Sequence, residues 1–166
     1  MKTVTMKVRT AERHEIDALA TLWYESWQDA HAEILPAELA RVRTLENLRE
    51  RLGELWTDMR VIGDVGHPLG LSITKGDELN QLYVSREARG QGAAQKLIAE
   101  VEERLAASGI ATAWLACAIG NTRAARFYEK SGWHLACTFT NELDLPSGKF
   151  SLDVWRYEKQ LQQDGE

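Results

Sequence analysis

Residues 85–105, SREARGQGAAQKLIAEVEERL, place Gly90 and Gly92 beside Arg89 where an apolar-striped helix is expected to begin. The first turn of a helix leaves backbone N–H groups unpaired at the positive end of the helix dipole, and glycine lets an anion approach them closely. Arg89 adds a positive charge. The segment is therefore a candidate anion site, and the alternative is that both glycines serve only the turn.

Two nucleotide-binding motifs fit this segment less well. A dinucleotide-binding GxGxxG loop needs Gly or Ala where the chain has Gln95, and its strand should open a βαβ series. A Walker A loop needs Gly-Lys followed by Ser or Thr, but Gly148 and Lys149 precede Phe150. Neither nucleotide-binding fold is favoured.

Hydrophobic periodicity predicts the elements that must position this turn. A change from helical spacing to short β-rich runs near residue 59, and back again after the glycines, indicates a mixed α/β (α+β) domain. The predicted order is β-α-α-β-β-β-α-β-α-β-β. The expected strands are residues 3–10, 59–64, 69–74, 78–85, 112–119, 133–141 and 149–158, and the expected helices are 12–30, one from Pro36 to near Leu55, 93–107 and 121–132.

Composition limits the class of protein. The chain has 166 residues, of which 44% are hydrophobic, and this predicts one domain over residues 1–166. A net charge of -5 argues against nucleic-acid or membrane partners. The first residues lack a secretory pattern, so a cytoplasmic location is expected. Cys117 and Cys137 are isolated, which predicts reduced thiols and no metal site.

Two motifs carry a family resemblance. Leu82-Tyr83-Val84 followed by residues 89–94, RGQGAA, resembles the acyl-CoA signature [QR]-x-x-G-x-[GA] of the GNAT superfamily of N-acyltransferases. Residues 121–133, NTRAARFYEKSGW, resemble that family's second signature, N-x-x-A-x-x-[FL]-Y-x-x-x-G-[FW]. The resemblance covers about residues 78–135. It implies a mostly antiparallel central sheet with flanking helices, splayed between the strands at 78–85 and 112–119.

The resemblance also implies acetyl-CoA as co-substrate. The pyrophosphate would lie on the amides of residues 89–95, and pantetheine would run beside residues 82–84 like an added strand. Asn121 can serve as a helix N-cap, as a cofactor contact, or as both. The expected cofactor-binding residues are Leu82, Tyr83, Val84, Arg89, Gly90, Gln91, Gly92, Ala93, Ala94, Gln95, Asn121, Ala124 and Phe127.

Acetyl transfer to an amine needs an acid, a base and an oxyanion donor. Tyr128 stands where the family carries its usual general acid, and its phenol can protonate a departing thiolate. Its alternative role is packing beside Phe127. Glu78 is the candidate base, directly or through water, because strict alternation places residues 78, 80, 82 and 84 on one face. The alternative for Glu78 is a solvated strand end. A backbone N–H at or near Leu82 would hold the oxyanion.

The acceptor is not identified by any motif. Trp23, Trp27 and His31 can line an acceptor pocket, although core packing is the stronger expectation for the two tryptophans. An acetylated Cys117 is not favoured, because a thiol in an apolar strand is inert. We expect direct attack by a small-molecule or peptide amine in a ternary complex. The alternative is a non-catalytic acyl-CoA-binding regulatory domain.

An oligomeric state is also predicted. Trp155 and Tyr157 share one face of the last expected strand. If no helix of the same chain covers that face, a homodimer would bury it.

Overall fold

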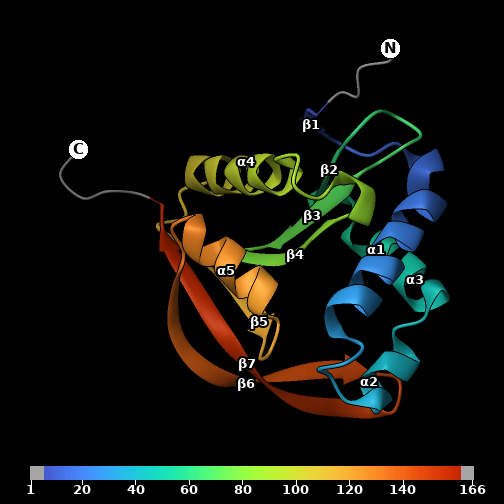
Figure 1. Ribbon diagram of the computed structural model, residues 1–166, viewed down its shortest axis with the longest axis vertical. Coiled ribbons are helices and arrows are strands. Elements are labelled where there is room, and N and C mark those ends of the chain that lie inside the picture. The colour runs from blue at the N-terminus through green and yellow to red at the C-terminus, as the bar shows by residue number, and fades with distance from the viewer. Residues whose placement is uncertain (1–5, 162–166) are drawn as a thin grey trace.

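A seven-stranded sheet with helices on both faces forms the centre of the protein (Figure 1). The computed structural model describes residues 6–161. The strand order is β1-β2-β3-β4-β5-β7-β6, and every neighbouring pair is antiparallel except β4 and β5. The strands are β1 (Val8–Arg9), β2 (Met59–Ile62), β3 (Gly70–Lys75), β4 (Glu78–Val84), β5 (Thr112–Ala118), β6 (His134–Leu145) and β7 (Gly148–Gln160). The predicted mixed, mostly antiparallel sheet is confirmed.

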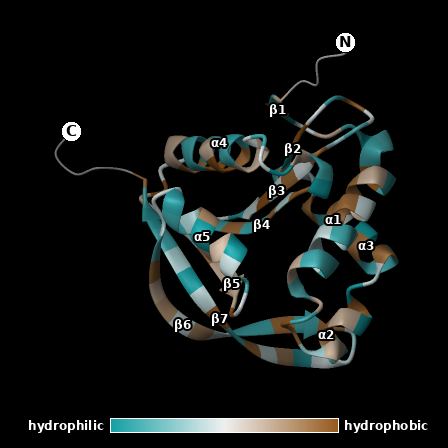
Figure 2. Ribbon diagram, viewed as in Figure 1, coloured by the Kyte–Doolittle hydropathy of each residue, from teal (hydrophilic) through white to brown (hydrophobic). Residues whose placement is uncertain are grey.

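Five helices flank the sheet in two groups. They are α1 (Ile16–His31), α2 (Ala37–Val42), α3 (Leu45–Leu55), α4 (Ala93–Ala107) and α5 (Thr122–Lys130). On one face, Trp23 of α1 and Leu48 of α3 pack with Leu71 of β3. On the other, Val101 of α4 packs with Leu115 of β5. Figure 2 shows brown and teal residues alternating along α4 and β7, as expected for elements with one buried side.

The region before β2 differs from the sequence prediction. The single helix predicted from Pro36 to near Leu55 is two helices, α2 and α3. Thr44 starts a new helix at this point. Its side-chain oxygen accepts a hydrogen bond from the backbone N–H of Asn47 at 3.1 Å, which makes it the N-cap of α3. Of the predicted first strand, residues 3–5 lie outside the described residues, and only Val8–Arg9 is a strand.

The last two strands are longer than predicted. β6 and β7 form a long hairpin whose register runs to the pair Leu145 and Gly148. Near its tip, Leu143, Leu145 and Phe150 pack against the apolar cluster of α1 and α3, and this packing stabilises the extension. In Figure 1 the hairpin sweeps along one side of the molecule toward α2.

The sheet opens between β4 and β5. The register of this parallel pair consists of one position, Glu78 opposite Trp114. Beyond that position the two strands separate, so backbone groups of β4 that face β5 have no ladder partner there. The predicted splay is confirmed.

A β-bulge alters β4 just after this point. Ile73 lies opposite Gln81, whereas Thr74 lies opposite Leu79, so Asn80 is left without a partner on β3. As a result Leu79 and Leu82 pack against the same apolar cluster. The strict alternation predicted for residues 78–84 is therefore wrong at Asn80.

None of the helices described between residues 6 and 161 has the length and apolar character needed to span a bilayer.

Candidate active site

The glycine turn connects β4 to α4 through a short 3-10 helix, Arg86–Ala88. Gly90 and Gly92 have φ values of +78° and +85°, a conformation that L side chains rarely adopt. Gly92 is the N-cap of α4, and the only neighbour within 4 Å of a Cβ built there is the Gln95 side chain, at 3.8 Å. The turn therefore requires glycine for its backbone and leaves space in front of it.

This turn presents unpaired donors. Within the described part of the chain, the N–H groups of Gly90, Gln91 and Gly92 donate to no carbonyl. The first-turn amides of α4, at Ala93 and Ala94, have no intrahelical acceptor by the geometry of a helix. The candidate anion site therefore has the chemistry of a phosphate cradle at the start of a 15-residue helix.

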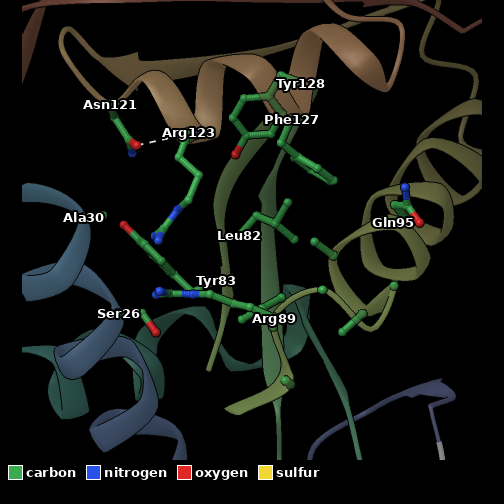
Figure 3. A pocket seen from close by; sticks show the side chains of 17 residues that line it. Ser26, Ala30, Leu82, Tyr83, Arg89, Gln95, Asn121, Arg123, Phe127 and Tyr128 are labelled. Atoms are coloured by element: carbon green, nitrogen blue, oxygen red, sulfur yellow. Dashed lines mark hydrogen bonds between the residues drawn. The ribbon is translucent and has the colours of Figure 1, made fainter. Parts of the chain in front are cut away.

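A cavity of about 390 Å³ opens in front of the turn (Figure 3). It lies between β4, the start of α4, and α5. Gln91 does not line it; its side-chain amide donates to the Glu87 carbonyl at 3.0 Å. The predicted cofactor-binding residues that line it are Leu82, Tyr83, Val84, Arg89, Gly90, Gly92, Ala93, Ala94, Gln95, Asn121, Ala124 and Phe127.

Arg89 has a partner that the sequence did not indicate. Its Nη2 lies 2.6 Å from Oδ2 of Asp29 on α1, and Arg86 and Arg123 lie 2.6 and 3.7 Å from the same carboxylate. Hydrogen bonds from Arg89 and Arg86 hold the pKa of Asp29 below its usual range. Figure 3 shows Arg89 and Arg123 extending toward α1, where Ser26 and Ala30 lie. Three guanidinium groups thus surround one carboxylate, and two of them, Arg89 and Arg123, belong to residues that line the cavity.

Asn121 caps helix α5 and also lines the first cavity. Its Oδ1 accepts a hydrogen bond from the Ala124 N–H at 3.3 Å, which makes it the N-cap of α5, and the residue also lines the cavity. The N-cap role is confirmed. A cofactor contact stays a prediction.

Tyr128 projects from α5 into the gap between β4 and β5. The residue is 9% exposed, and its ring packs near Phe127, Trp133 and Tyr157 at centroid distances of 5.5 to 6.3 Å. In Figure 3 its hydroxyl points into the cavity toward Leu82. Burial raises the pKa of Tyr128 above its usual value, so the phenol keeps its proton at neutral and mildly basic pH.

A second cavity, of about 200 Å³, shares the wall of the first. Glu78, Trp27 and His31 are among its lining residues. Burial raises the pKa of Glu78 above its usual value. The residues that line both cavities are Leu82, Tyr83, Asn121, Ala124 and Tyr128. Tyr128 therefore belongs to both cavities, and Glu78 only to the second.

The aromatic residues of α1 divide between core and cavity. Trp23 is fully buried, as expected of a core residue. Trp27 is 6% exposed, belongs to the same apolar cluster, and also lines the second cavity. His31 lies within 3.2 Å of the Trp27 carbonyl through Nδ1, and burial lowers its pKa to about 4. The imidazole is therefore neutral at pH 7.

Cys117 lines the second cavity as a protonated thiol. Burial raises its pKa to about 12, which leaves little thiolate near neutral pH. The described residues contain no cluster of three or more histidine, cysteine, aspartate or glutamate side chains that could hold a metal ion.

Several residues of the site were not found by sequence reasoning. Arg123 lines the first cavity and lies 3.7 Å from Asp29, and Arg43 and Arg51 line the second cavity. Little in the sequence placed these four residues in a site, because single charged residues on helices are usually exposed to solvent. Thr44 could have indicated the helix break that places Arg43 beside the cavity.

The face of β7 considered for dimerisation is covered at Tyr157 by the same chain. Tyr157 is 2% exposed, its ring lies 6.2 Å from that of Tyr128, and its hydroxyl donates to Glu129 at 2.6 Å. Since α5 of the same chain covers Tyr157, the face considered for dimerisation is not open there. The homodimer stays a prediction without this support.

Comparison with known proteins agrees with the fold and the motifs. A GCN5-related N-acetyltransferase from Rhodopseudomonas palustris superimposes with a TM-score of 0.73 at 19% identity, over 96% of this chain and 98% of that one. The PaiA N-acetyltransferase from Thermoplasma acidophilum, in complex with coenzyme A, gives 0.70 at 18%, over 96% and 99%. A putative acetyltransferase from Salmonella typhimurium with acetyl-CoA gives 0.69 at 14%, over 97% and 96%.

At these identities the structures establish the fold alone. Comparison of the sequence with curated proteins finds no match. Residues 16–133 match the Acetyltransferase (GNAT) family, and this match covers more than half of the chain and includes both motifs and the glycine turn. The protein therefore belongs to the GNAT family of acetyltransferases.

Proposed function

We propose that the protein transfers an acetyl group from acetyl-CoA to a primary amine by direct attack within a ternary complex. The observation that carries this proposal is the position of Tyr128, which lines both cavities at the place where β4 and β5 part. Two substrates can meet at such an opening without leaving their own cavities. The structural neighbours that contain coenzyme A or acetyl-CoA support the choice of donor.

The first cavity fits the donor. Unpaired amides at residues 90–94 and two positive-φ glycines with open space before them suit a pyrophosphate. The β4 backbone beside the gap suits an amide-bearing pantetheine arm, and Leu82 and Val84 supply apolar contact. Acetyl-CoA, when bound, supplies the activated thioester.

We assign the acid role to Tyr128 and the oxyanion role to backbone. The Tyr128 phenol is protonated, half enclosed by aromatic rings and directed into the cavity, so it can give a proton to a departing thiolate. A β4 N–H at or near Leu82 that faces the gap can stabilise the negative charge that develops on the carbonyl oxygen.

We assign the base role to Glu78, acting through water. Leu82 is four positions after Glu78, about 13 Å along β4, which is too far for direct proton transfer between these two points. The raised pKa of Glu78 makes it a stronger base than an exposed glutamate. His31 is a weaker base, because burial lowers its pKa to about 4.

Thiol release from acetyl-CoA tests the function. Purified protein is incubated with acetyl-CoA and a broad amine panel of amino acids, amino-acid amides, polyamines, aminoglycosides and peptide N-termini. We expect amine-dependent thiol release and an acetylated product of the expected mass. A protein that binds acetyl-CoA by calorimetry yet releases no thiol with any amine would instead be a non-catalytic acyl-CoA-binding domain.

A further inference from the structure

Two arginines lie at the second cavity without a carboxylate partner. Arg43, between α2 and α3, is 8% exposed, and Arg51 of α3 is half-buried. Among the described residues, no carboxylate lies within ion-pair distance of either side chain. Arg43 Nη1 donates to Asn47 Oδ1 at 3.3 Å, and the Arg51 guanidinium stacks on Trp23 at 4.9 Å. These contacts orient the guanidinium groups but form no ion pair, and Glu54 on α3 acts on Arg51 only from beyond ion-pair distance.

Three half-buried arginines among the described residues are paired with carboxylates, whereas a fourth, Arg60, donates to the backbone carbonyls of Thr57 and Met59. Arg9 pairs with Glu15 at 2.8 Å, Arg104 with Glu100 at 3.0 Å, and Arg156 with Glu158 at 2.7 Å. Arg43 is more buried than these arginines. Burial, with repulsion from Arg51 as a smaller cause, lowers the pKa of Arg43 to about 10. Two buried or half-buried guanidinium groups that lie close together without an ion-pair partner lower the stability of the folded protein. A structural role alone therefore does not explain Arg43 and Arg51.

The charges divide the second cavity into two ends. Arg43 and Arg51 lie at the end formed by α2 and α3, and Glu78 lies where β4 still pairs with β5. A cavity of about 200 Å³ accepts a molecule of amino-acid size. It therefore offers an anion site at the end formed by α2 and α3.

We propose that the acceptor is a small amine that also carries a carboxylate, and that Arg43 and Arg51 bind this carboxylate. The inference rests on the proposed function, since it names the substrate class of the same site. Two guanidinium groups can donate paired hydrogen bonds to a carboxylate, and its negative charge would compensate both cations. The amine would then lie toward the gap, where Tyr128 lines both cavities.

Matched acceptor pairs test the carboxylate. Each L-amino acid is compared with its own primary amide in the thiol-release assay at pH 8. Amidation lowers the pKa of the neighbouring amine, so intrinsic reactivity favours the amide, and a preference for the acid must come from the protein. We expect kcat/KM for the best acid to exceed that of its amide by at least about 100-fold, because the amide leaves buried donors unpaired.

Three variants assign the preference to its residues. In Arg43→Gln and Arg51→Gln, we expect the acid-to-amide ratio to fall to within a few-fold of 1. Arg49→Gln is the matched control, because Arg49 lies on the same helix as Arg51 but pairs with Asp17 on the surface. Its ratio should stay at the wild-type value. Each ratio is taken within one preparation, so the folded fraction of a destabilised variant cancels.

The outcomes separate the two proposals. Amides that react as well as acids, or a ratio unchanged in both variants, would overturn the carboxylate inference and leave the proposed function standing. A preference for aminoalkylphosphonates over matched carboxylates would likewise overturn the choice of carboxylate. Thiol release from no amine of the wider panel would be a failure of the proposed function, and the inference would fall with it.

Discussion

The two cavities beside the β4/β5 gap differ in the groups that line them, which are mainly backbone groups in the first and charged side chains in the second. The first cavity presents unpaired backbone amides at residues 90–94 and the edge of β4. Gly90 and Gly92 adopt positive φ values there, which residues with side chains rarely do. The second is lined by side chains of opposite charge, Arg43 and Arg51 at one end and Glu78 at the other. A backbone cradle can serve one cofactor in many family members, whereas exchangeable side chains can adapt the second cavity to an acceptor.

The largest expected effect comes from the residue that belongs to both cavities. Tyr128→Phe keeps the ring packing but removes the proton, so we expect kcat to fall about 10²- to 10⁴-fold, with little change in acetyl-CoA affinity. Tyr24→Phe is the matched control, because Tyr24 packs on the α1 side and lines neither cavity. A near wild-type kcat for Tyr128→Phe, with chemistry limiting, would make Tyr128 a packing residue.

The pH profile gives an independent measure of Tyr128. The phenol donates only while protonated, and burial raises its pKa above the usual value of 10.0. The rate should therefore not fall between pH 9 and 10, and any decline should begin above pH 10. A decline centred below pH 9.5 that persists in Tyr128→Phe would assign this limb to another group.

Glu78→Gln tests the acceptor side by itself. A base acting through water is expected near the lower end of the usual range, so kcat should fall about 100-fold while the acetyl-CoA Kd stays constant. Burial raises the pKa of Glu78, so wild-type activity should be lost on acidification at a higher pH than an exposed glutamate would give. Glu78→Gln should lack that acidic limb. His31→Gln is the comparison and should keep that limb, because a group with a pKa of about 4 cannot set a limb above the pH at which an exposed glutamate titrates.

Gly92→Val tests the cofactor side by itself. The side chain would stand before the unpaired amides, and we expect the acetyl-CoA Kd to rise at least about tenfold, or about 1.4 kcal/mol. Gly109→Val is the matched control for backbone strain, because Gly109 has a φ of +87° and free space around it at the other end of α4. Equal acetyl-CoA affinities for the two folded variants by calorimetry would refute the phosphate assignment.

The smallest expected effect concerns Asp29. Its carboxylate neutralises part of the charge of Arg86, Arg89 and Arg123, and the last two of these arginines line the first cavity. Asp29→Asn should therefore tighten acetyl-CoA binding about 2- to 5-fold at low salt, within the usual range for exposed ion pairs. Asp17→Asn, at the other end of α1, should leave the Kd unchanged. Weaker binding in Asp29→Asn would show that the carboxylate positions the arginines more than it opposes the phosphates.

The sequence predicted the first cavity far better than the second. Gly90, Gly92, Asn121 and Tyr128 stand at fixed spacings, because each meets a demand of the backbone or of a cofactor shared across the family. The splay between β4 and β5 followed from the same motifs.

The second cavity depends on features with weak local signals. Arg43 reaches it only because Thr44 breaks a helix, and β4 changes its alternation only because Asn80 bulges. The hairpin extension depends on packing of Leu143 and Leu145 against distant helices, which a strand pattern does not contain. These features are set by tertiary contacts, so local periodicity could not predict them.

A crystal structure with coenzyme A tests the central claim most directly, namely that the two cavities meet at Tyr128. We predict that the pyrophosphate lies on the amides of residues 90–94 and that the sulfur lies within hydrogen-bonding reach of the Tyr128 hydroxyl, with the second cavity still open beyond it. A sulfur far from Tyr128, or a coenzyme whose arm fills the second cavity, would contradict the account.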